Sequence, residues 1–129
     1  MLLSFKAPGC DESPVCVVYH QDKFFASFSL AGSVMLFNNA GEYLYGIGNN
    51  GSGDGKFLKP VGLVIDKLNS LILCDAGSRK LQLFTLDGKC ITRIAGSFFE
   101  DGDPRYAVIS DTGHLFVSDS DWNCVLVSH

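Results

Sequence analysis

The sequence has few histidines, prolines and tryptophans, and no long uncharged apolar stretch. Among its 129 residues there are three histidines, four prolines and one tryptophan. A helix that spans a membrane needs roughly 18–20 consecutive apolar residues, and no stretch reaches that length. Residues 1–6 lack the basic lead and the apolar length of a secretory signal peptide. The composition therefore excludes a helical membrane span, and we expect an ordinary strand at residues 2–5.

Basic residues are also scarce. The chain has 10 Lys and Arg residues against 14 Asp and Glu residues, which gives a formal net charge of −4. Proteins that bind nucleic acid usually carry a basic excess, because neutralising phosphates releases counterions. Apolar residues make up 47% of the chain and charged residues 19%. This balance disfavours general nucleic-acid binding and excludes a disordered acidic segment.

The five cysteines do not form the pattern of a disulfide framework or a zinc site. Their number is odd, and no two of them are spaced as Cys-x-x-Cys. They are Cys10, Cys16, Cys74, Cys90 and Cys124, and the last four lie inside apolar runs. Buried thiols in a reducing compartment fit this arrangement best. We therefore expect no metal, no cofactor and a cytoplasmic location.

What the sequence does have is glycine, 14 residues in all, and an internal repeat. Pro14, Pro60 and Pro104 follow one another at intervals of 46 and 44 positions. Asp75 and Asp119 are likewise 44 positions apart. A period of roughly 44–47 residues suits a four-stranded propeller blade and is too long for most helical or leucine-rich repeats. The sequence predicts an all-β fold, a β-propeller of four-stranded antiparallel blades, with about three blades in this chain.

The middle unit shows the four strands of a blade most clearly. We expect strands at residues 61–65, 71–74, 80–85 and 90–95, separated by turns. The second of these strands is apolar on both faces, as a strand in the interior of a blade would be. The fourth alternates between apolar and polar residues, which is typical of an outer strand.

The same unit resembles an NHL repeat. A glycine-rich lead is followed by a phenylalanine, a proline, an aspartate, an arginine and an apolar strand that ends in phenylalanine. The residues of this blade motif are Gly55, Phe57, Pro60, Asp75, Arg79 and Phe84, with Asp119 in the third unit. The first unit departs from it, with Phe28 in place of Asp75 and Gly32 in place of Arg79. The resemblance, in particular to NHL domains of tripartite-motif proteins, implies a six-bladed ring that serves as a non-catalytic binding scaffold.

Three units amount to half of such a ring. They cover approximately residues 14–48, 60–96 and 104–129, and the third supplies only the strands at 106–110, 115–119 and 124–128. Residues 2–5 precede Pro14 as a displaced outer strand. Two copies could close a six-bladed ring, with each copy's residues 2–5 completing the last blade of the other. Alternatively, the sequence is a fragment or a short product with open blade edges.

Connectors between units, together with the turns after each second strand, should gather at one end of the blades. Loops on a rigid scaffold often carry function, so we expect a binding face there. The acids expected on this face are Asp11, Glu12, Asp54, Asp75, Glu100, Asp101, Asp103, Asp119 and Asp121, and the bases are Lys6, Lys56, Lys59, Arg79 and Arg105. This excess of acids favours a protein or peptide partner over RNA.

Candidate partner-binding residues on that face are Arg79, Arg105, Tyr106, Asp121 and Trp122. An exposed tryptophan would anchor a protein partner, although Trp122 could equally cap a blade edge. Arg79 could instead pair with Asp75 to hold the turn together. The arginines and aromatics could also clamp or stack on a base, so RNA recognition stays the alternative function. By the NHL resemblance, a protein partner would be a substrate recruited to a ubiquitin ligase.

The sequence matches known catalytic and ligand-binding motifs only in part. Residues 51–56 lack the Gly-Lys-Ser/Thr ending of a phosphate loop, and Val61 stands where a calcium loop needs its bidentate glutamate. His20, His114 and His129 are expected at the opposite end of the blades and not around one metal. We therefore predict that the protein is not an enzyme.

Overall fold

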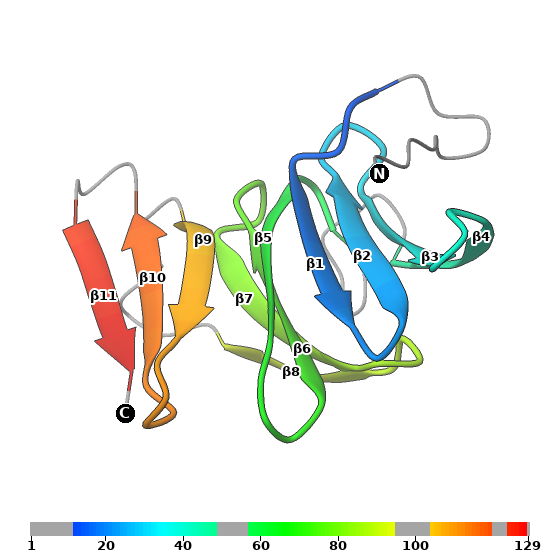
Figure 1. Ribbon diagram of the computed structural model, residues 1–129. Coiled ribbons are helices and arrows are strands. Elements are labelled where there is room, and N and C mark those ends of the chain that lie inside the picture. Colours follow the sequence, from blue (N-terminus) through cyan, green and yellow to red (C-terminus); the bar gives the residue numbers. More distant parts are fainter. Residues whose placement is uncertain (1–11, 49–56, 95–103, 120–123, 129) are drawn as a thin grey trace.

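The computed structural model describes residues 12–48, 57–94, 104–119 and 124–128, and Figure 1 shows their strands. These ranges contain eleven strands and no helix, so none of the described residues forms a helix that could cross a membrane. The predicted all-β fold is confirmed. The expected strand at 2–5, together with Gly55, Asp121, Trp122 and His129, lies outside the described residues.

The strands form three antiparallel sheets, each a blade. Blade 1 consists of β1 (Cys16–His20), β2 (Lys23–Phe28), β3 (Ser33–Asn38) and β4 (Tyr43–Ile47), paired in that order. Blade 2 consists of β5 (Pro60–Ile65), β6 (Ser70–Asp75), β7 (Lys80–Thr85) and β8 (Cys90–Ile94). Blade 3 contains β9 (Pro104–Ile109), β10 (Leu115–Asp119) and β11 (Cys124–Ser128) among the described residues. Blades 1 and 2 confirm the predicted four-stranded antiparallel sheet.

β5 and β9, the first strands of blades 2 and 3, start earlier than the sequence pattern indicated. β5 begins at Pro60 and β9 at Pro104, one and two residues before the expected starts. Proline lacks an N–H, but a strand tolerates it at its first residue, where a ladder hydrogen bond can be spared. The prolines that mark the repeat therefore also open the first strand of blades 2 and 3.

The first strand of each blade lies beside the first strand of the next. β1 contacts β5, and β5 contacts β9, so the three blades stand side by side as in a propeller (Figure 1). Side chains alternate along a strand, so each blade has two faces. We call the face toward the blade that follows in sequence the forward face, and the other the backward face.

Apolar side chains fill both seams between blades. The seam between blades 1 and 2 contains Phe25, Val34, Leu36, Ile47, Phe57, Leu63, Leu71, Leu73 and Phe84, all buried. The seam between blades 2 and 3 is smaller and contains Cys74, Leu81, Ala107 and Val117. Every residue of β6 from Leu71 to Asp75 is buried, as predicted for a strand in the interior of a blade.

Candidate functional site: the connector face

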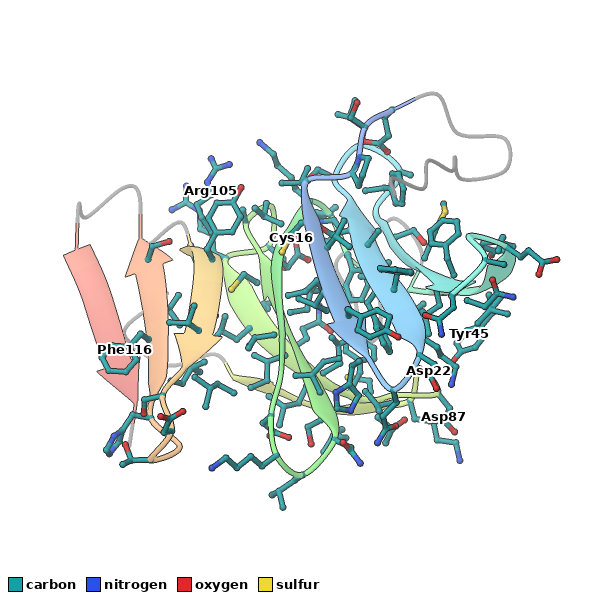
Figure 2. All side chains as sticks on the ribbon, in the orientation of Figure 1. Cys16, Asp22, Tyr45, Asp87, Arg105 and Phe116 are labelled. Carbon is teal, nitrogen blue, oxygen red and sulfur yellow. The ribbon has the colours of Figure 1, made fainter. Side chains whose placement is uncertain are left out.

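Connectors and the turns after β2 and β6 meet at one end of the blades, which we call the connector face. Its described residues are 12–15, 29–32, 57–59, 76–79 and the start of β9. Arg105 lies at this end of β9 (Figure 2). The opposite end, which we call the hairpin face, carries the turns that follow β1, β3, β5, β7 and β9.

Asp75 joins two separate segments of the connector face. Its carboxylate is fully buried and accepts hydrogen bonds from the backbone N–H groups of Leu58 at 3.0 Å and Lys59 at 2.8 Å. It also accepts from the N–H of Gly77 at 3.2 Å and from the hydroxyl of Ser78 at 2.6 Å. Hydrogen bonds to an ionised acceptor are stronger than neutral ones, and four of them offset the cost of burying the charge. The connector before β5 and the turn after β6 are thereby held in one fixed arrangement.

Gly77 allows this close approach. A Cβ atom at that position would lie 2.6 Å from the Cβ of Leu58 and 2.9 Å from the N of Lys59. Real Cβ atoms do not come that close to other heavy atoms, so a side chain at residue 77 would push the connector off the turn. Arg79 closes the turn in a left-handed conformation, with φ of 60°, and its side chain is exposed.

Blade 1 has an equivalent junction, but its carboxylate belongs to the connector and not to the turn. Phe28 occupies the position of Asp75, but Glu12, in the segment before β1, accepts from the N–H of Ala31 at 2.6 Å and of Leu30 at 3.0 Å. The connector therefore supplies the acceptor and the turn supplies the donors, which is the reverse of blade 2. Sequence analysis counted Glu12 only as one acid among nine. The sequence signal for this role was the position of Glu12. It lies 46 residues before Leu58, on the connector that faces the turn after Phe28.

The phenylalanines of the repeat pack in the seam between blades 1 and 2. Phe57 and Phe84 are both fully buried, with ring centroids 5.2 Å apart and planes at 78°. Such edge-to-face pairs contribute beyond their buried area. Gly48, at φ +79°, leaves room for the ring, since a Cβ there would lie 2.4 Å from Phe57 Cε2. These residues of the motif lie in the core and do not reach the surface.

Two serines of blade 1 bind the first strand of blade 2. Ser27 donates to the carbonyl of Val61 at 2.7 Å, and Ser29 donates to the carbonyl of Pro60 at 2.6 Å. Both serines are buried, so these bonds satisfy carbonyls at the first strand of blade 2 that no water reaches. Sequence analysis missed both serines, because one small polar residue in a strand, such as Ser27, or in a turn, such as Ser29, gives no pattern of its own.

The seam between blades 2 and 3 uses a glycine instead. A Cβ atom on Gly62 would lie 2.5 Å from the carbonyl oxygen of Arg105 and 2.7 Å from the Cα of Tyr106. The backbones of β5 and β9 therefore touch at this point. No turn signal in the sequence marked Gly62.

The candidate ligand residues Arg105 and Tyr106 lie where β9 is irregular. Tyr106 pairs with Ser118 and Pro104 pairs with Asp119, so Arg105 is an extra residue in the strand. Tyr106 lies on the forward face, and 48% of its surface is exposed. Asp121 and Trp122 lie outside the described residues.

The acids of the described connector face bind backbone groups. Of the nine acids predicted there, Glu12 and Asp75 are the two whose side chains are described, and both accept hydrogen bonds from turn or connector N–H groups. The side chains of Lys59 and Arg79 are exposed, and those of Glu12 and Arg105 are half-buried. The described part of this face therefore carries charges of both signs.

The hairpin face links blades through polar contacts. His20 Nε2 lies 2.9 Å from Asn69 Oδ1, and Lys67 Nζ donates to the carbonyl of Asp111 at 3.0 Å. Tyr45, shown beside Asp87 in Figure 2, donates to the carbonyl of Leu86 at 3.0 Å. Burial and the nearby Asp87 carboxylate raise the pKa of Tyr45.

No group of three metal-ligating side chains occurs among the residues whose placement is described. His20 lies at the end of β1, and His114 contacts Thr112 in the turn after β9 at 2.9 Å. Both histidines belong to the hairpin face. In the described part of the chain, the structure brings no histidine to the connector face.

Known β-propellers resemble this chain in sequence and in structure. Residues 12–100 match the model of a family described as 6-bladed beta-propeller. No curated protein has a matching sequence. A predicted exported protein of Bacteroides fragilis NCTC 9343 is similar in structure, with a TM-score of 0.74 and 17% identity over 90% of this chain and 33% of that one.

Two further solved structures are similar. A catalytically inactive virginiamycin B lyase of Staphylococcus aureus with quinupristin has a TM-score of 0.71 and 10% identity, over 95% of this chain and 43% of that one. The computationally designed Ika4 protein has a TM-score of 0.54 and 10% identity, over 97% of this chain and 96% of that one. These identities show the fold alone. The chain spans less than half of the natural structures that it matches here.

Proposed function

Since the chain belongs to the 6-bladed beta-propeller family, we propose that it is a non-catalytic scaffold whose connector face binds a protein or peptide partner. The observation that carries the proposal is the Asp75 junction. Four hydrogen bonds to one buried carboxylate hold residues 58–59 and 76–78 in place before any partner arrives. A surface that is already ordered loses little conformational entropy on binding, which favours affinity.

The chemistry of this face supports a polar partner. Lys59 and Arg79 are exposed beside the fixed junction, and they can contact carboxylates or carbonyl groups of a peptide. Trp122 and Asp121 remain predicted contacts, as do Arg105 and Tyr106. The finer part of the proposal, a cytoplasmic scaffold that recruits partners in a tripartite-motif ligase setting, rests on the resemblance of residues 51–84 to an NHL repeat. The free thiols of Cys16, Cys74 and Cys90 are compatible with a reducing compartment.

Selection from a displayed peptide library on the immobilised protein tests the proposal. We expect binders whose affinity falls about tenfold or more with Lys59→Glu and Arg79→Glu combined, because each reversal replaces attraction by repulsion. Lys89→Glu, on the hairpin face, is the matched control and should leave the affinity unchanged. An equal loss of affinity with Lys89→Glu, or a selection that yields no binder, would count against peptide binding at the connector face.

RNA recognition is tested in parallel with a randomised RNA pool at two salt concentrations. A protein that holds phosphates by charge loses affinity steeply as salt rises. We expect no enrichment of any sequence. Strong and salt-sensitive enrichment that Lys59→Glu abolishes would instead establish the RNA-binding alternative.

The absence of catalysis is a separate part of the proposal. The fold is shared with a lyase that was solved with quinupristin, so quinupristin is the first compound to incubate with this protein. We expect the compound to be recovered intact with and without added divalent metal. Turnover that depends on His20 or His114 would overturn the non-catalytic proposal.

A further inference from the structure

The connector face carries two exposed leucines beside its exposed cations. Leu30, in the turn after β2, is 80% exposed, and Leu58, in the connector before β5, is 41% exposed. Lys59 follows Leu58 in the connector, and Arg79 lies in the turn after β6; both side chains are exposed. Apolar and cationic side chains thus occur together at one end of the seam between blades 1 and 2.

Hydrogen bonds place these residues in one strip across the seam. The Ser29 hydroxyl donates to the Pro60 carbonyl at 2.6 Å, which joins the turn after β2 to the end of the connector. The Ala76 N–H donates to the Lys59 carbonyl at 3.0 Å, which joins the connector to the turn after β6. The connector therefore lies between the two turns. We call the four exposed residues, in their order across the seam, the seam strip: Leu30, Leu58, Lys59 and Arg79.

The turn after β2 does not depend on the side chain of Leu30. The bonds that join this turn to the connector before β1 run from the backbone N–H groups of Leu30 and Ala31 to Glu12, at 3.0 and 2.6 Å. The equivalent residue in the turn after β6, 47 positions later, is Gly77, which has no side chain. The apolar group of Leu30 is therefore available to a ligand without loss to the turn.

The described acids beside the strip are engaged by backbone N–H groups. Glu12 is half-buried and accepts from the turn after β2. Asp75 is fully buried and accepts from the N–H groups of Leu58 and Lys59. Such bonds compensate a carboxylate where it stands, while the exposed charged side chains of the strip are both cations. A carboxylate on a ligand is therefore attracted to the strip.

We propose that the ligand of the connector face is a peptide segment that presents a large apolar side chain next to an Asp or Glu. This inference rests on the proposed function and names the class of its ligand. The apolar side chain would cover Leu30 and Leu58, and the carboxylate would pair with Lys59 and Arg79, which gives an apolar centre with a charged rim. RNA fits the strip less well, because bases stack on aromatic side chains and the apolar side chains of the strip are aliphatic.

The sequences of the peptides selected from the displayed library are the first test. We expect Leu, Ile, Met or Phe beside Asp or Glu to be enriched over the unselected library. Binders that are lost with Lys59→Glu and Arg79→Glu combined, but show no such enrichment, would overturn this inference and leave the proposed function standing. A selection that yields no binder would overturn both.

Leu30→Ser tests the apolar half of the strip on a selected peptide. We expect the affinity to fall about threefold or more, with the same dependence on salt as the wild type. Leu68→Ser is the matched control, because Leu68 is 86% exposed in the turn after β5 on the hairpin face, and it should leave the affinity unchanged. Both side chains are exposed, so both variants should keep the circular dichroism of the wild type. An unchanged affinity with Leu30→Ser, or an equal loss with Leu68→Ser, would overturn the apolar contact.

Lys59→Gln tests the charged half together with a change in the peptide. Replacing the acid of the peptide by its amide should lower the affinity for the wild type about twofold to fivefold. The same replacement should cost almost nothing with Lys59→Gln, because that ion pair is already lost. Lys89→Gln, on the hairpin face, should behave as the wild type. An equal cost with Lys59→Gln would show that the carboxylate does not meet Lys59, and RNA enrichment that Lys59→Gln abolishes but Leu30→Ser leaves intact would overturn the peptide ligand.

Discussion

Asp75 shows what a single buried carboxylate contributes to a connector. Its two oxygens divide the donors: one accepts from Lys59 and Gly77, and the other from Leu58 and Ser78. Asp75→Asn keeps the shape of the side chain but replaces the oxygen that accepts from Leu58 and Ser78 by an NH₂ group. The N–H of Leu58 then meets another donor in a buried site. We expect the free energy of unfolding in urea to fall by about 2–3 kcal/mol.

Asp66→Asn is the control for that substitution. One oxygen of Asp66 accepts from both Leu68 and Ser70 in an accessible turn, and an amide oxygen can keep both bonds. The expected loss is below about 0.5 kcal/mol. Equal losses for the two variants would mean that Asp75 acts by no more than ordinary turn capping.

Cys74 makes stability depend on pH. Burial, with a smaller contribution from Cys16, raises the pKa of its thiol from 9.0 to about 12. The unfolded chain therefore releases this proton first as pH rises, and the folded chain binds more protons between pH 9 and 12. Stability is fully present below pH 9 and falls above it, by up to about 1.4 kcal/mol per pH unit.

Cys74→Ser isolates this effect, because serine occupies the equivalent positions 27 and 118 and does not titrate in this range. Denaturation of both proteins at pH 8, 9 and 10 should give a stability difference that narrows or reverses as pH rises. Parallel profiles would show that the thiol is not kept neutral by burial.

At the scale of the element, the seam between β5 and β9 depends on a glycine. Gly62→Ala puts a methyl group 2.5 Å from the Arg105 carbonyl oxygen, and both neighbours are backbone atoms of a paired strand. We expect blades 2 and 3 to separate and the free energy of unfolding to drop by about 1–3 kcal/mol.

Gly46→Ala in β4 is the comparison for the same change. A Cβ atom there meets Ser33 Oγ and Tyr43 Oη at 3.4 Å, an ordinary contact distance. The free energy of unfolding of the Gly46→Ala variant should change by less than about 1 kcal/mol. Tolerance of alanine at residue 62 would show that the two strands have room to adjust.

The elements were easier to predict than the contacts between them. Alternation and turn residues located β5 to β8 within about one residue, because both act over a few neighbours. Glu12 was not predicted, because its contacts are with residues 18 and 19 positions further along the chain. Phe28 in place of Asp75 indicated a degenerate repeat, whereas the carboxylate had moved 16 residues upstream to the other side of the same junction. A pattern read along the chain does not show such an exchange across space.

The candidate site was predicted in outline for a similar reason. Alternation of connectors placed Arg79 and Arg105 at one end of the blades. The extra residue at Arg105, between Pro104 and Tyr106 that pair with consecutive residues of β10, gave no signal in the sequence.

At the scale of the whole molecule, the two described seams differ in the amount of apolar surface that they bury. The seam between blades 1 and 2 contains nine buried apolar residues, and the seam between blades 2 and 3 contains four. Blade 3 should therefore open before the other two blades, because less buried apolar surface holds it in place. We expect amide hydrogens of β9 and β10 to exchange with solvent faster than those of β2, β3, β6 and β7. Equal protection in all three sheets would mean that the described blades open as one unit, through the contacts between β1, β5 and β9.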